Sequence, residues 1–144
     1  MKHVVPLARL YFALIFILAA PGHFKSDTIG YAAAHGVPFP SLLVPASGLI
    51  ALAGGLSILL GFQARWGAWL LVLFLVPVTL SMHNFWAVQD PAAAMIQRIM
   101  FEKNLSMLGG ALLIAYFGSG PWSLDSRLKC CCHRECTSKP EPAE

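Results

Sequence analysis

The stretch that organises this chain is residues 81–110, which read SMHNFWAVQDPAAAMIQRIMFEKNLSMLGG. It joins the third and fourth apolar runs of the sequence and holds most of the polar groups near the middle of the chain. Charged residues are scarce, at 12% of the chain against 57% hydrophobic residues. In such a chain, a polar side chain that enters an apolar run is paired, reaches the membrane surface or serves the function.

The composition indicates an integral membrane protein with one membrane domain. The 144 residues fit a single domain by length. Four separate apolar runs leave too few charged residues to cover a water-soluble surface. The formal net charge of +3 is modest. We therefore expect the lipid bilayer as the main partner and no nucleic-acid partner.

The four apolar runs predict membrane-spanning helices. They cover residues 4–20, 41–62 and 66–86, and a last run that begins between residues 93 and 96 and ends at Phe117. The first run is slightly short for a bilayer core of about 30 Å. The predicted fold is an all-α membrane protein, a four-transmembrane-helix bundle with a short interfacial helix in the first loop.

The first loop carries the signals for that interfacial helix. Residues 26–35 are half polar, with Ser26 or Asp27 as the N-cap and Gly36 as the stop. Residues 37–40 read VPFP and are expected to be extended, because each proline moves the preceding residue out of the helical region.

Arg9 lies about one turn inside the first run, where it is expected to reach back to the membrane surface. A cleaved signal peptide is the alternative, since Lys2 precedes an apolar stretch that ends in two alanines at 19 and 20. Leu18 before that point and Arg9 within the run both argue against cleavage.

A stripe of small residues marks the second run. Ser47, Ala51 and Gly55 recur at four-residue spacing, with Gly48 and Gly54 nearby. Such a stripe lets another helix backbone approach closely. Close packing within one bundle is the favoured interpretation, and a face between two copies of the chain, giving a homo-oligomer, is the alternative.

The distribution of positive charge predicts the orientation. The N-terminal end, the second loop and the C-terminal tail hold seven Lys and Arg residues, and the first and third loops hold three. Cytoplasmic segments carry the excess. Both termini are thus expected in the cytoplasm, which places His83 and Trp86 at the outer surface of the inner membrane.

Two groups of residues at that outer end are candidates for ligand binding. Lys103 and Asn104 share a broad face of the last helix and, with His83 and Trp86 across the loop, predict a polar pocket for the oxygens of a quinone or another small acceptor. The alternative is that these are interfacial side chains without a ligand.

Other polar residues near that end are weaker candidates. Arg98 and Glu102, four residues apart, are expected to pair. Lys25, with His23 and His35 of the first loop, is expected near the opening of the same polar pocket.

The tail is a second, separate segment. We expect residues 1–124 to form the membrane domain and residues 125–144 to form a disordered, Cys-rich cytoplasmic tail. Cys132, His133 and Cys136 are weak metal candidates, because adjacent cysteines fit a zinc tetrahedron poorly. Palmitoylation, thiol exchange and unmodified thiols are the other interpretations.

The sequence resembles the DoxX family of small membrane proteins over roughly residues 7–127. The motifs that carry the resemblance, in chain order, are Arg9, GHFK at 22–25, GVPFP at 36–40, GG at 54–55 with Gly61, HNFW at 83–86, KN at 103–104 with GG at 109–110, and GP at 120–121 with SLD at 123–125. Two positions depart from the pattern, because relatives often carry a glutamate near Ala51 and a histidine shortly before Lys103.

The resemblance implies a four-helix bundle in a prokaryotic cytoplasmic membrane. It also implies a link to quinone or thiosulfate oxidation and to oxidative stress. We therefore expect a redox-associated membrane subunit that interacts with quinone or a partner oxidoreductase. A non-catalytic membrane scaffold or a small-molecule permeation protein is the alternative. No motif assigns a catalytic residue, so whether the chain is an enzyme stays open.

Overall fold

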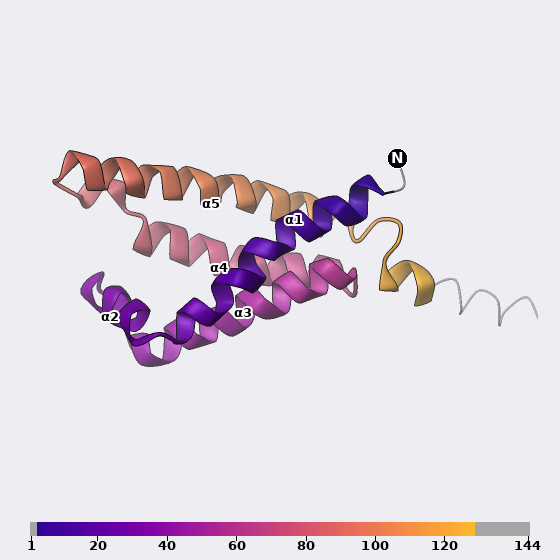
Figure 1. The fold of residues 1–144 in the computed structure, drawn as a ribbon, viewed down its shortest axis with the longest axis horizontal. Helices are drawn as coiled ribbons and strands as arrows, with labels where there is room; N and C mark the ends of the chain where they lie inside the picture. The colour runs from indigo at the N-terminus through magenta and orange to yellow at the C-terminus, as the bar shows by residue number, and fades with distance from the viewer. Residues whose placement is uncertain (1–2, 129–144) are drawn as a thin grey trace, which may run out of the picture.

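The computed structural model describes residues 3–128, and all of its regular structure is helical. In chain order the elements are α1 (Val4–Ala19), η1 (Ala20–Phe24), α2 (Ser26–Ala34), α3 (Pro40–Leu60), α4 (Ala64–Met82), η2 (Phe85–Ala87) and α5 (Pro91–Phe117) (Figure 1). The all-α prediction and the short helix in the first loop are confirmed. Cys132, His133 and Cys136 lie outside the described residues.

Local sequence signals fix several helix ends. The carboxylate of Asp90 accepts a hydrogen bond from the Ala93 amide at 2.8 Å, and Pro91 follows as the first helical residue of α5. Helix α3 ends at Gly61, whose φ of 64° is the left-handed conformation that glycine adopts without strain. Its amide bonds to the Ile58 carbonyl and closes the last turn.

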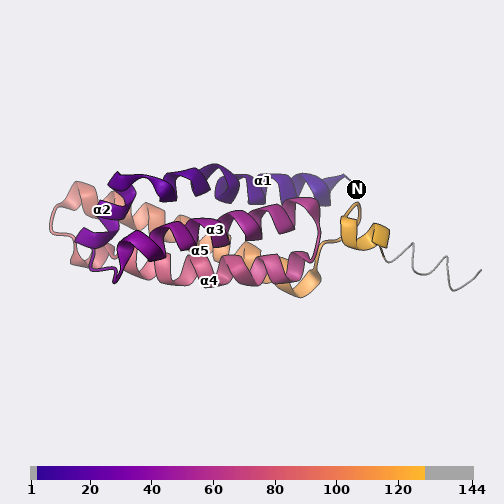
Figure 2. The same cartoon turned by 90° about the horizontal axis from the view of Figure 1, so that it is seen from below.

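The long helices run side by side, and α2 lies across one end of them (Figure 2). Helix α4 packs against both α3 and α5, and α1 packs against α3. Residues from these four helices form the core: Ala13, Phe16, Ala51, Ile58, Ala68, Leu71, Phe74, Leu75 and Ala111. Many core positions are alanines, so the helix backbones lie close together.

The glycines of α3 make its packing specific. A Cβ on Gly54 would lie 2.8 Å from the Gly67 carbonyl oxygen of α4, and one on Gly55 would lie 3.3 Å from the Cβ of Phe16 on α1. One on Gly48 would meet His23 of η1 at 2.6 Å. The small-residue stripe therefore packs within the bundle, as the favoured interpretation predicted.

Within residues 3–128, three helical stretches are long and apolar enough to cross a membrane: Val4–Phe24, Pro40–Leu60 and Ala64–Ala87. The predicted fourth span corresponds to α5, which has 27 residues but does not belong to this set. Its first half contains Arg98, Glu102 and Lys103, and the first two form the expected ion pair at 2.9 Å.

Two local predictions were wrong. Phe39 adopts a left-handed conformation, with φ of 45°, instead of an extended one, because it is the N-cap from which Pro40 starts α3. The third predicted helix ends at Met82, so Trp86 lies on η2. Arg9 is only 6% exposed, and its position relative to the membrane surface stays a prediction.

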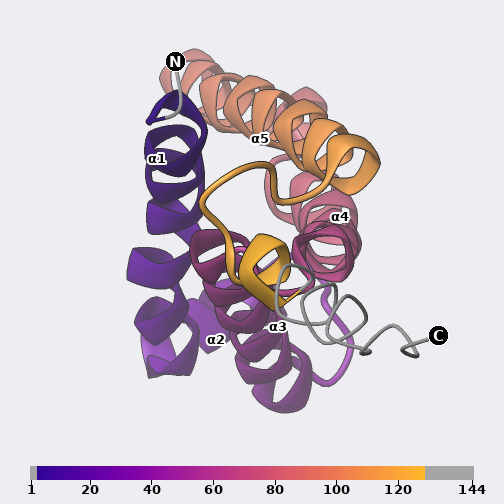
Figure 3. The same cartoon turned by 90° about the vertical axis from the view of Figure 1, so that its right-hand side faces the viewer.

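The buried guanidinium of Arg9 holds the segment that follows α5. Its Nη1 donates to the Ser119 carbonyl at 3.1 Å, and its Nη2 donates to the Trp122 carbonyl. Arg9 therefore ties the first helix to a segment more than a hundred residues away. Figure 3 shows this segment, in orange and yellow, lying across the end of the bundle.

The same segment contacts the turn between α3 and α4. The Asp125 amide donates to the Gly61 carbonyl at 3.0 Å, and its carboxylate accepts from the Gln63 amide at 2.9 Å. Ser123 is 3% exposed and lies beside Gly61. The tail was expected to begin at Asp125. Residues 124–128 instead form a helical turn, and Asp125 contacts the turn between α3 and α4.

We expect the substitution Arg9→Leu to lower the free energy of unfolding by about 2–4 kcal/mol, because it removes the two hydrogen bonds by which a buried charged side chain joins α1 to the segment after α5. Thermal unfolding of the purified protein in detergent measures this. The matched control is Arg98→Leu, which removes an exposed ion pair and should cost about 0.5 kcal/mol or less. Equal losses for the two variants would contradict the role given to Arg9.

Candidate ligand-binding site

A cavity of about 310 Å³ lies at the end of the bundle that α2 covers. Helices α2, α3 and α4 and the turn η1 contribute its walls. The apolar lining consists of Ala32, Val37, Leu43, Val44, Ala46, Ile50, Leu73, Phe74, Pro77, Val78 and Met82, and the polar lining of His23, Thr28, Ser47 and Ser81. The cavity is therefore an apolar site with a few polar groups, as is usual for small-molecule sites.

His23 is the titratable side chain in this lining. Its Nδ1 lies 3.2 Å from the Ala19 carbonyl oxygen, and its ring meets the edge of Phe74 with centroids 5.6 Å apart. Because a carbonyl oxygen only accepts, Nδ1 carries the proton and Nε2 of the neutral ring accepts a hydrogen bond. The absence of a side chain at Gly48 makes room for the Cβ of His23.

The hydroxyls of the two cavity serines donate hydrogen bonds to backbone carbonyls of their own helices. Ser47 Oγ donates to the Val44 carbonyl and Ser81 Oγ donates to the Pro77 carbonyl, each at 2.7 Å. Since these protons are already engaged, the two hydroxyl oxygens can only accept a further hydrogen bond. His23 and Thr28 remain as the side chains that exchange a proton or donate a hydrogen bond to a ligand oxygen.

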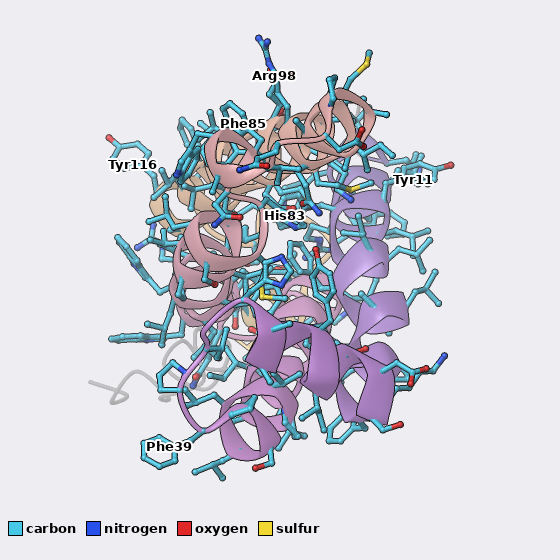
Figure 4. The ribbon with its side chains drawn as sticks, turned by 90° about the vertical axis from the view of Figure 1, so that its left-hand side faces the viewer. Tyr11, Phe39, His83, Phe85, Arg98 and Tyr116 are labelled. Carbon is cyan, nitrogen blue, oxygen red and sulfur yellow. The ribbon has the colours of Figure 1, made fainter. Side chains whose placement is uncertain are left out.

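A hydrogen-bonded chain joins three elements at the same end. His83 Nδ1 lies 2.8 Å from Gln97 Oε1, and Gln97 Nε2 donates to the Tyr31 hydroxyl at 2.9 Å. The Tyr31 ring packs on His35 with centroids 4.1 Å apart. Gln97 of α5 thereby connects α2 to the end of α4, and Figure 4 shows His83 in the middle of this end.

The residues of the predicted polar pocket have different surroundings. His83 contacts Gln97, and Asn104 is only 6% exposed inside the bundle. Lys103 is exposed, with Nζ 3.2 Å from the sulfur of Met100. Trp86 is 61% exposed and packs on Phe85 and Phe101. Ligand binding by these residues stays a prediction.

The first-loop candidates divide in the same way. His23 lines the cavity and His35 supports Tyr31, while Lys25 is exposed at the start of α2. Sequence reasoning missed Gln97 and Tyr31. The available signals were an uncharged amide near the start of α5 and a tyrosine in the interfacial helix, but nothing in the sequence places the two side chains together.

Within residues 3–128, no group of three or more His, Cys, Asp or Glu side chains has an arrangement suited to a metal ion. The only metal candidates from the sequence, Cys132, His133 and Cys136, lie beyond this range.

Comparisons with known proteins identify relatives. The model of the DoxX family matches residues 4–84. Inner membrane protein YqjF of Escherichia coli (strain K12) is 33% identical over 126 residues, which cover 86% of this chain and 91% of the relative. Inner membrane protein YphA of the same strain is 32% identical over 123 residues, covering 84% and 87%.

A more distant relative is the ER-derived vesicles protein ERV29 of Saccharomyces cerevisiae (strain ATCC 204508 / S288c). It is 25% identical over 81 residues, which cover 56% of this chain and 26% of that protein. No solved structure matches the chain.

We expect Gln97→Leu to loosen α2, because it removes both hydrogen bonds of the chain that joins Tyr31 to His83. A net loss of about 1 kcal/mol corresponds to roughly fivefold faster hydrogen exchange of the α2 amides. Hydrogen-exchange mass spectrometry of residues 26–34 measures this. The control Gln89→Leu changes an exposed loop amide and should leave exchange in α2 unchanged. Unaltered exchange in the Gln97 variant would show that the contact does not hold α2 in place.

Proposed function

The chain belongs to the DoxX family and is an integral membrane protein. We propose that it is a redox-associated subunit that binds a quinone in the cavity beneath α2. A partner oxidoreductase exchanges electrons with that quinone. The chain itself supplies the binding site and a group that takes up or returns a proton.

The observation that carries the proposal is the lining of the cavity. A quinone is a flat, largely apolar ring with two oxygens, so it suits an apolar site with a few polar groups. The cavity has such a lining, with His23 at one wall. The Nε2 of the neutral His23 ring suits a hydroxyl of the reduced quinol, and the protonated ring suits a carbonyl oxygen of the oxidised form.

A membrane arrangement with four spans is part of the proposal. Helix α5 has 27 residues, about 40 Å of helix, which is enough to cross a bilayer. Asn104 and Ala111 are buried on its inner face, and its charges lie in the first half. With four spans, both termini lie on one side, and the excess of positive charge supports the cytoplasmic side.

The alternative of a small-molecule permeation protein receives less support. Arg9 and the segment after α5 cover the end of the bundle opposite to α2. A route along the bundle axis would have to displace these contacts. These contacts favour binding in the cavity over passage along the bundle.

The test is binding of a short-chain ubiquinone to the purified full-length protein in detergent, followed by thermal unfolding with increasing quinone. We expect a saturable rise of the melting temperature. The substitution Ala46→Phe places a ring in the cavity, where even a few lost contacts of about 1.4 kcal/mol in total weaken binding tenfold.

The matched control is Leu113→Phe, which adds a ring at an outward-facing position of α5 that is 60% exposed. It should bind quinone like the unchanged protein. The proposal fails if the unchanged protein gains no stability from quinone. It also fails if a folded Ala46→Phe variant binds as well as the control.

A further inference from the structure

A second cavity, of about 410 Å³, lies at the opposite end of the bundle, between the start of α4 and the segment that follows α5. We propose that this cavity binds the phosphate group of an anionic phospholipid. Its lining contains one guanidinium and one carboxylate, two hydroxyls and two aromatic rings: Arg65, Asp125, Ser119, Ser126, Trp66 and Phe117, together with Gln63, Gly118 and Gly120. It shares no lining residue with the cavity beneath α2.

Arg65 is the group that recognises the phosphate. It lies over the backbone at the end of α5, where a Cβ on Gly118 would come 3.2 Å from its Nε. The glycine therefore leaves room for the guanidinium beside Ser119 at the cavity wall. Arginine presents several N–H donors in one plane, and these match the oxygens of a phosphate better than a lysine does.

The charge balance at this end favours an anion. Among residues 3–128, it carries the three arginines Arg9, Arg65 and Arg127 and a single carboxylate, Asp125. The other end carries three cations and three carboxylates, so its charges cancel. One oxygen of Asp125 already accepts from the Gln63 amide, and its charge is attracted by Arg9. Arg65 thus adds a positive charge that Asp125 does not balance.

The aromatic residues of the lining favour a lipid over a soluble phosphate. Trp66 and Phe117 are each 72% exposed, so their rings are available to a ligand at the cavity rim. Tryptophan is enriched at the level of the headgroups. A phospholipid held by its phosphate at Arg65 would place its acyl chains along these rings, whereas a soluble phosphate ester would leave the rings in contact with water.

Titration of the purified full-length protein with phosphatidylglycerol, followed by native mass spectrometry in detergent, tests this. We expect one tightly held lipid, and about tenfold weaker binding in Arg65→Gln, which corresponds to loss of one charge-assisted contact. Arg65→Lys keeps the charge and should recover part of the affinity. The matched control Arg98→Gln removes an exposed arginine at the other end and should bind like the unchanged protein.

Two further titrations identify the ligand. Phosphatidylcholine carries the same phosphate with a choline cation beside it, so it should bind the unchanged protein more weakly than phosphatidylglycerol does, and equal binding of the two lipids would overturn the preference for an anionic lipid. Inorganic phosphate at millimolar concentration should not compete with phosphatidylglycerol. Equal binding of phosphatidylglycerol by Arg65→Gln and Arg98→Gln would overturn the site. Displacement of the lipid by inorganic phosphate would overturn its assignment to a lipid.

Discussion

The contact between Arg9 and the carbonyls of Ser119 and Trp122 is the interaction on which one end of the molecule depends. A guanidinium on the first membrane helix has no water to bind when neighbouring helices surround it, so its protons need partners from the chain itself. The backbone after α5 supplies acceptors for Nη1 and Nη2, because it no longer follows helical geometry and its carbonyls are free to accept, while Nε has no partner among the described residues. The need to satisfy one buried charge thus determines where the chain goes after its last long helix.

This constraint makes the two ends of the bundle different. At the Arg9 end, the segment after α5 lies across the helices and bonds to the turn between α3 and α4. At the other end, α2 covers a cavity whose walls are mostly apolar, and one amide, that of Gln97, connects α2 to α4 and α5. The hydrogen bonds of the Arg9 end come from a charged guanidinium, whereas the hydrogen bonds of Gln97 that hold α2 are between neutral groups and are weaker.

Much of the fold could be predicted from the sequence, because the decisive signals are local. Apolar runs set the long helices, Gly61 and Pro91 mark helix ends, and the glycines of α3 predict close packing. The partners of Arg9 and of Gln97 could not be predicted, since they lie far away in the chain and depend on how helices are placed in space. The same holds for the cavity, whose walls come from four elements. Phe39 shows the limit of a local rule, because the start of α3 overrides the extended preference of a residue before proline.

The contact between Gly48 and His23 links two positions that are 25 residues apart along the chain. Any side chain at position 48 would push against the Cβ of the histidine and against the backbone of η1. The imidazole can therefore keep its place in the cavity wall only while position 48 remains a glycine. Across related sequences, the two positions should consequently vary together, with a bulkier residue on α3 appearing where the histidine has been replaced or lost.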